Sequence, residues 1–147
     1  MPTATKTKTK IERVPVTLRL KPYIMQYLRI KAAVNAIKTN IVVENALAQL
    51  ILSKNKLSVA QDHAFLMWSA NADRAKYTLT ISPQILGHLR RLARQANTQI
   101  SLTAEAALVA AIYRDISLAD SGTLADPVLA SAVKVFQKHE LQDLQGR

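Results

Sequence analysis

The sequence predicts a mainly α-helical protein with one short, two-stranded antiparallel β-ribbon. The first observation behind this prediction is a repeat: the stretch 16–51 lies over the stretch 77–112 without a gap, and eleven of 36 positions are identical. Chance would give roughly two or three identities in a composition this rich in Ala and Leu. The second observation is that each copy changes from period-two to helical spacing, which predicts the order strand, helix, helix.

The predicted strands are the alternating runs 16–20 and 77–81, each with one apolar and one polar face. A lone strand of this length cannot satisfy its backbone hydrogen bonds, so the two strands are expected to pair antiparallel, with four helices packed beneath them. The residues expected to point outward are Thr17, Arg19 and Lys21 in the first copy and Lys76, Thr78, Thr80 and Ser82 in the second.

The predicted helices follow from turn and capping residues. Pro22 and Pro83 fit the first helical position, where a missing N–H costs nothing, and Ser82 is a candidate cap. A polar break in each copy separates the first helix from a second one, for which Asn40 and Ser101 are the candidate caps.

A further amphipathic helix is expected after Asp126 and Pro127. Its apolar face contains Leu129, Ala132, Val133 and Phe136. This face either packs back on the domain or binds another protein, and the sequence does not separate these two options.

The duplicated pattern resembles the ribbon-helix-helix family of DNA-binding proteins. The resemblance rests on residues 16–22 and 77–83, and on Glu44 and Glu105 early in the second helices, and it covers about half of the chain. Ordinary members build the ribbon from two chains. Here one chain holds both strands, as in the TraY-type accessory proteins of conjugative relaxosomes. The resemblance therefore implies a tandem pseudo-dimer that is monomeric when free, with further assembly on DNA left open.

The expected organisation has five parts. They are a basic disordered arm at 1–13, a first ribbon-helix-helix repeat at 14–53, a partly helical linker at 54–75, a second repeat at 76–117, and a C-terminal extension with the amphipathic helix at 118–147. Within the linker, Trp68 is expected to belong to the core.

The charge favours a polyanionic partner. The net charge is +10, and it is uneven: residues 1–56 contain eleven Lys and Arg against two acids, whereas residues 57–147 contain nine against eight. Such a field attracts nucleic acid and produces salt-dependent binding.

Other classes of protein find little support in the sequence. There is no cysteine, so a disulfide framework and a Cys-based metal site are excluded. The three histidines are isolated and the three glycines form no phosphate loop, so neither an enzyme nor a bound metal or cofactor is expected. With no apolar run of membrane-spanning length and no signal peptide, a cytoplasmic protein without a membrane partner is expected.

The resemblance implies sequence-specific binding of double-stranded DNA, with the ribbon in the major groove. The residues expected to contact bases are Thr17, Arg19, Lys76, Thr78 and Thr80. Lys21 and Ser82 are expected at the ribbon ends, and the helix starts at Asn40 and Ser101 are expected to hold flanking phosphates. Because the outward residues differ between the two strands, the DNA target should be asymmetric.

Three biological roles remain open. One is an accessory factor at a plasmid transfer origin, with a relaxase or another conjugation protein as a partner. A second is a transcriptional repressor, including an antitoxin that regulates its own operon. A third, of a different class, is a helical adaptor that binds protein through the Phe136 face.

Overall fold

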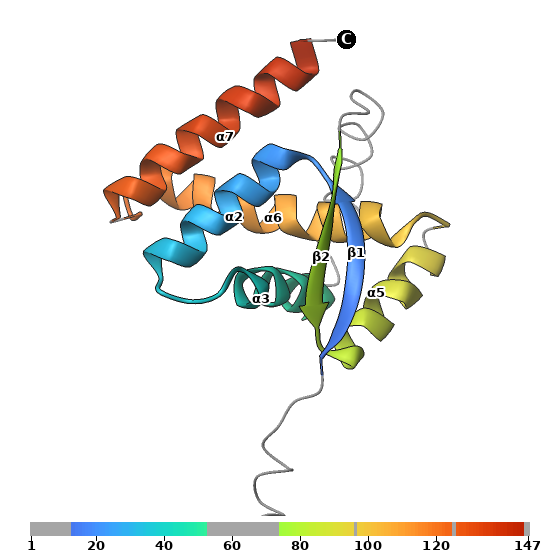
Figure 1. Ribbon diagram of the computed structural model, residues 1–147. Helices are drawn as coiled ribbons and strands as arrows, with labels where there is room; N and C mark the ends of the chain where they lie inside the picture. The colour runs from blue at the N-terminus through green and yellow to red at the C-terminus, as the bar shows by residue number, and fades with distance from the viewer. Residues whose placement is uncertain (1–12, 53–73, 96, 125, 146–147) are drawn as a thin grey trace, which may run out of the picture.

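The computed structural model describes residues 13–52, 74–95, 97–124 and 126–145 (Figure 1). Its elements, in order, are β1 (Val14–Leu20), α2 (Pro22–Val34), α3 (Thr39–Leu52), β2 (Ala75–Ile81), α5 (Pro83–Gln95), α6 (Ile100–Asp120) and α7 (Pro127–Gln145). The predicted mainly helical fold with one two-stranded antiparallel sheet is confirmed. The expected arm at residues 1–12 and most of the expected linker, Trp68 included, lie outside the described residues.

The ribbon is formed by β1 and β2 in a register that centres on two threonines. Thr17 pairs with Thr78, and these two residues occupy the same position in the two copies of the sequence repeat. Towards one end of the ribbon Arg19 pairs with Lys76, and towards the other end Pro15 pairs with Thr80. We call these the Arg19 end and the Thr80 end.

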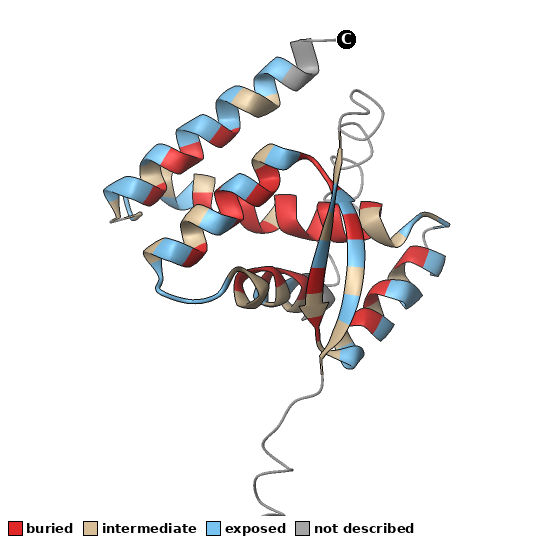
Figure 2. Ribbon diagram, viewed as in Figure 1, coloured by how far each residue is buried: buried red, intermediate tan, exposed pale blue. Residues whose placement is uncertain are grey.

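The core lies between the inner face of the ribbon and the helices. Leu18 and Leu20 of β1 and Leu79 and Ile81 of β2 are buried, as the alternation predicts. Beneath them runs α6, most of whose first half is buried, and Figure 2 shows this helix as the most deeply covered element behind the ribbon. Burial of the apolar strand face against the helices, chiefly α3 and α6, supplies the partner that a lone strand lacks.

Several helices begin or end at the residues that favour helix termini. Helices α2, α5 and α7 begin at prolines, and the Ser82 hydroxyl accepts a hydrogen bond from the Ile85 N–H (3.3 Å) at the start of α5. The turns after α2 and α5 contain Ala36 (φ 57°) and Asn97 (φ 55°), which occupy the same position in the two copies. A left-handed residue at this position ends a helix sharply.

Helix α7 packs back on the domain. Phe136 is buried, with its ring 5.3 Å from the ring of Tyr23 and 6.0 Å from the ring of Tyr27, both on α2. His139 stacks on Tyr23 at 5.4 Å. The structure thus selects one of the two options for the apolar face of this helix: the face packs on α2 and is covered in this structure.

Two of the expected boundaries, that between the arm and the first repeat and that between the linker and the second repeat, move by one or two residues. In each case the arginine before the strand bonds to a helix of its repeat. The sequence places Arg13 in the arm, but this residue bonds to Glu44. It places Arg74 and Ala75 in the linker, yet Arg74 bonds to Glu105 and β2 begins at Ala75. Each arginine is held because a carboxylate on the second helix of its own copy accepts its hydrogen bonds.

Candidate nucleic-acid interface

The outer face of the ribbon brings together all five residues predicted to contact bases. Thr17, Arg19, Lys76 and Thr78 are exposed and Thr80 is half-buried. At the centre, the Thr17 and Thr78 hydroxyl oxygens lie 3.1 Å apart in a hydrogen bond. This bond holds the two central side chains side by side on the surface of the ribbon.

The two ends of this face differ in charge. At the Arg19 end, Arg19 and Lys76 are direct neighbours across the strands, and neither forms an ion pair with another described residue. At the Thr80 end the corresponding neighbours are Pro15 and Thr80, which carry no charge. From the sequence, the asymmetry of this face is a difference between the two strands, with Arg19 on the first strand where the second has Thr80. The antiparallel register instead divides it by end, because it sets Arg19 beside Lys76.

Lys21 does not lie on the outer face, contrary to the sequence prediction. Its side chain is buried, with 1% of the residue exposed, and its carbonyl accepts the Ile24 N–H (3.0 Å) at the start of α2. The strand ends at Leu20 and α2 begins at Pro22, so Lys21 lies at the junction, where the alternation of the strand no longer sets the direction of its side chain. Lys21 therefore leaves the set of candidate DNA contacts.

Ser82 remains at the ribbon end, and its N–H and hydroxyl both bond to other residues of the chain. Its N–H donates to Glu44 Oε2 (2.7 Å), and its hydroxyl caps α5 as predicted. The hydroxyl accepts in this cap, so its own O–H can still donate to an acceptor on DNA.

Asn40 and Ser101 are not helix caps, so that part of the prediction is wrong. Helix α3 begins one residue before Asn40, and α6 begins one residue before Ser101 after Gln99, which makes no side-chain cap. Both side chains reach the ribbon instead. Asn40 Nδ2 donates to Thr80 Oγ1 (2.9 Å), and Ser101 Oγ accepts the Arg19 N–H (3.0 Å).

These two contacts place the start of each second helix against the strand of the other copy. Asn40 and Ser101 are equivalent positions of the repeat, and so are Arg19 and Thr80. The first turns of α3 and α6 therefore flank the outer face, and backbone N–H groups at a helix start suit anions.

Two ion pairs that the sequence reasoning missed fix the strands to the second helices. Arg74 lies against Glu105 in a two-pronged contact, Nε to Oε2 at 3.2 Å and Nη2 to Oε1 at 3.0 Å. Arg13 contacts Glu44 at 2.5 Å. The repeat also relates Arg13 to Arg74, so extending its alignment slightly towards the N-terminus would have found this pair.

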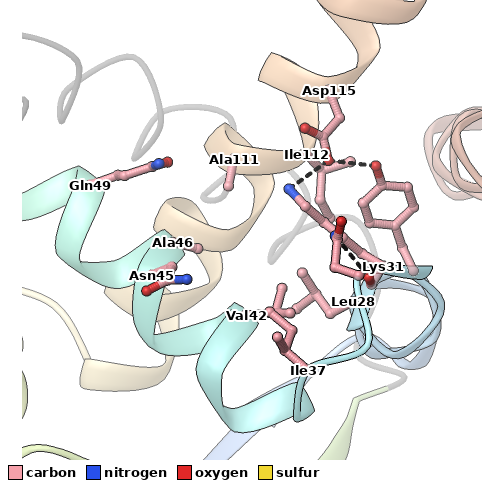
Figure 3. Close-up of a pocket in the computed structure, with 12 residues that line it drawn as sticks. Leu28, Lys31, Ile37, Val42, Asn45, Ala46, Gln49, Ala111, Ile112 and Asp115 are labelled. Atoms are coloured by element: carbon pink, nitrogen blue, oxygen red, sulfur yellow. Dashed lines mark hydrogen bonds and ion pairs between the residues drawn. The ribbon is translucent and has the colours of Figure 1, made fainter. Parts of the chain in front are cut away.

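A cavity of about 300 Å³ lies between α2, α3 and α6, away from the ribbon (Figure 3). Its polar wall is a buried cluster in which Asp115 Oδ2 accepts hydrogen bonds from the Tyr27 hydroxyl (2.6 Å) and from Lys31 Nζ (2.8 Å). Burial, and then the neighbouring Asp115 carboxylate, raise the pKa of Tyr27 above its ordinary value. Lys31 and Asp115 form an ion pair, so their opposite charges offset each other in this wall.

Membrane-spanning and metal-binding features are both absent from the described part of the chain. No helix among these residues is both long enough and apolar enough to cross a bilayer. The same residues contain no group of three or more side chains suited to holding a metal ion.

Comparison with known proteins gave no match, whether with family models, with curated proteins or with solved structures. The function is therefore inferred from the sequence and the geometry of the chain itself.

Proposed function

We propose that the protein binds double-stranded DNA of defined sequence, with the outer face of the β1–β2 ribbon inserted into the major groove. The observation that carries the proposal is the pairing of Arg19 with Lys76. Like charges directly opposite each other in a sheet are destabilising. An anion bound at the Arg19 end would offset that cost, and the floor of the major groove offers guanine acceptors between two rows of phosphates.

The two-stranded form of the ribbon supports the same proposal. A two-stranded ribbon fits the major groove of B-DNA, and its outward side chains can reach base edges there. The first turns of α3 and α6 lie on either side, held by the Asn40 and Ser101 contacts. In this arrangement their backbone N–H groups would meet the phosphates that border the groove.

We further propose that the chain is a single-chain pseudo-dimer, with its pseudo-twofold axis between Thr17 and Thr78. Matched contacts support this arrangement. The Arg13–Glu44 and Arg74–Glu105 ion pairs are related by the repeat, and the Asn40–Thr80 and Ser101–Arg19 hydrogen bonds join the same positions of the two copies.

Selection of bound sequences from random DNA tests the proposal, because it reports binding, site length and asymmetry together. In the selected site, Arg19→Ala should cost about 1–3 kcal/mol of specific binding and relax one base position, as expected for loss of an arginine bound to guanine. Lys134→Ala is the matched control, since it removes one exposed cation from α7. If folded Arg19→Ala protein binds every sequence as well as wild type, the ribbon is not the reading surface.

The charge difference between the ribbon ends predicts that the protein binds its site in one orientation. Exchanging Arg19 and Thr80 in a double variant moves the arginine to the other end, beside Pro15, so the preferred orientation on an asymmetric fragment should reverse. Footprinting of that fragment in both orientations measures the effect. A palindromic preference in the wild-type protein would contradict the predicted asymmetry.

For the biological role we propose an accessory factor at a plasmid transfer origin, because the tandem form is typical of that group. Repression of transcription, including autoregulation by an antitoxin, is the second candidate and uses the same DNA-binding face. Recruitment of a relaxase to the bound DNA by this protein, measured by gel shift, would favour the first role. We do not propose a helical adaptor that binds protein through the Phe136 face, because Phe136 is buried against α2.

A further inference from the structure

Helix α5 carries a cationic surface that the ribbon proposal does not use. Its inward residues Leu86, Leu89 and Ala93 are buried. Its outward residues Arg90, Arg91 and Arg94 are exposed, and none of them forms an ion pair with another described residue. We call these three residues the α5 arginine face.

Helix stability does not explain this arrangement. A cation in the last turn, such as Arg94, interacts favourably with the helix dipole. Arg90 lies one turn before Arg94 on the same side, where like charges repel, and α5 contains no acidic residue to compensate. The cluster therefore carries an electrostatic cost in the free protein.

The corresponding surface on the other copy is built differently. The equivalent residues of the first copy are Arg29, Ile30 and Ala33 on α2. Arg29 lies over the Tyr77 ring, 5.5 Å from its centroid, and Ile30 packs against the core. Helix α7 lies along α2, whereas α5 is on the opposite side of the ribbon, with exposed residues along its outer side (Figures 1 and 2). The arginines are thus a property of one side of the molecule only.

The position of this face connects it with the Arg19 end. At the C-terminal end of α5, the Asn97 N–H donates to the Arg94 carbonyl (3.1 Å) and the Thr98 N–H donates to the Ala93 carbonyl (2.8 Å). This tight corner leads into α6, whose Ser101 contacts the backbone of Arg19. The start of α6 therefore connects the backbone of Arg19 on the ribbon with the end of α5, where Arg94 lies.

We propose that the α5 arginine face binds backbone phosphates of the same DNA duplex, beyond the half-site read by Arg19 and Lys76. This inference rests on the proposed function and adds a one-sided extension of the binding site. Duplex DNA fits the face because phosphates recur along its backbone and arginine binds phosphate with paired hydrogen bonds. These contacts carry no sequence information, so they should strengthen binding and extend the footprint on one flank without changing the bases selected.

The test compares the triple variant Arg90→Gln, Arg91→Gln, Arg94→Gln with wild-type protein on the selected DNA site. The slope of log K against log salt is negative, and each lost phosphate contact reduces its magnitude by about 0.9. The salt dependence of the variant should therefore be shallower by roughly 2 to 3. Hydroxyl-radical footprinting should show lost protection only on the flank next to the Arg19 end. A control variant, Lys134→Gln with Lys138→Gln, removes two exposed cations from α7 and should change neither result. Thermal melts of all the proteins check that each remains folded.

The outcomes separate the two proposals. If wild-type protein does not bind duplex DNA, the proposed function fails and this inference fails with it. If wild-type protein binds, but the triple variant keeps its slope and both flanks of its footprint, only the α5 inference is overturned. Loss of protection on both flanks would also overturn it, because the arginines would then act through net charge and not through local contacts.

Discussion

Removal of Arg74 should destabilise the fold far more than removal of Arg13, although the repeat makes them equivalent. The exposed fractions of the Arg74 and Glu105 side chains are 4% and 0%, against 31% and 12% for Arg13 and Glu44. Breaking a buried pair by removing one partner costs about 3–5 kcal/mol, because a buried charge is left uncompensated. A partly exposed pair contributes up to about 1 kcal/mol, and Glu44 keeps its hydrogen bond from Ser82.

Urea unfolding measures the difference. With an m-value of roughly 2 kcal/mol/M, Arg74→Met should lower the midpoint by about 1.5–2.5 M and Arg13→Met by about 0.5 M or less. Methionine keeps most of the aliphatic bulk of arginine, so the comparison isolates the charge. The double variant Arg74→Met, Glu105→Leu should recover most of the loss, since apolar residues of similar volume can replace a buried ion pair. Equal losses in the two single variants, or no recovery in the double variant, would refute the reasoning.

Three further predictions follow from the fold. Leu18→Thr should cost about 3 kcal/mol or more, because it removes buried apolar volume and buries a hydroxyl, and circular dichroism melts would show a large drop in Tm. The free protein should sediment as a monomer at micromolar concentration, because β1 and β2 pair within one chain, and an obligate strand-exchanged dimer would contradict this. Burial and hydrogen bonds to Asp115 and Glu140 raise the pKa of Tyr27 and Tyr113 above the ordinary 10.0. The unfolded chain then releases protons that the folded chain retains, so stability should fall as pH rises through about 10, and absorbance at about 295 nm should show the buried Tyr27 ionising only as the protein unfolds.

Local features of the sequence were sufficient to predict the strands and the helix starts at proline. Alternation predicted that Leu18 and Leu79 are buried and that Thr17 and Thr78 are exposed, because period two in a half-buried strand depends only on which residues face the core. Pro22 fixes the first helical position through its own ring, and no distant contact is needed.

Features that depend on distant contacts could not be predicted in this way. Asn40 and Ser101 are of residue types that commonly cap helices. Each bonds instead to a strand of the other copy, which local capping rules do not consider. Lys21 continues the alternation of the strand in the sequence, but the chain changes to a helix at the next residue and its side chain is buried. The apolar face around Phe136 has the same composition whether it covers α2 or binds a partner.

The α5 arginine face was missed for a different reason, since charge was summed over each half of the chain. In the net charge of residues 57–147, the acidic residues cancel the arginines. The acidic residues described on α6 and α7 nevertheless form no ion pair with Arg90, Arg91 or Arg94. Binding depends on local potential, so a count of charge along each helix face would have been the more informative test.

A single chain permits the asymmetry on which both proposals depend. In a homodimer every substitution appears twice, so an arginine at one end of the ribbon is repeated at the other. Here Arg19 corresponds to Thr80, and Ile30 of α2 corresponds to Arg91 of α5. The two first helices can therefore differ, with Ile30 of α2 packed against the core and Arg91 of α5 exposed. Both changes increase positive charge on the same side of the ribbon, which is the arrangement expected of a protein that must bind DNA in one direction.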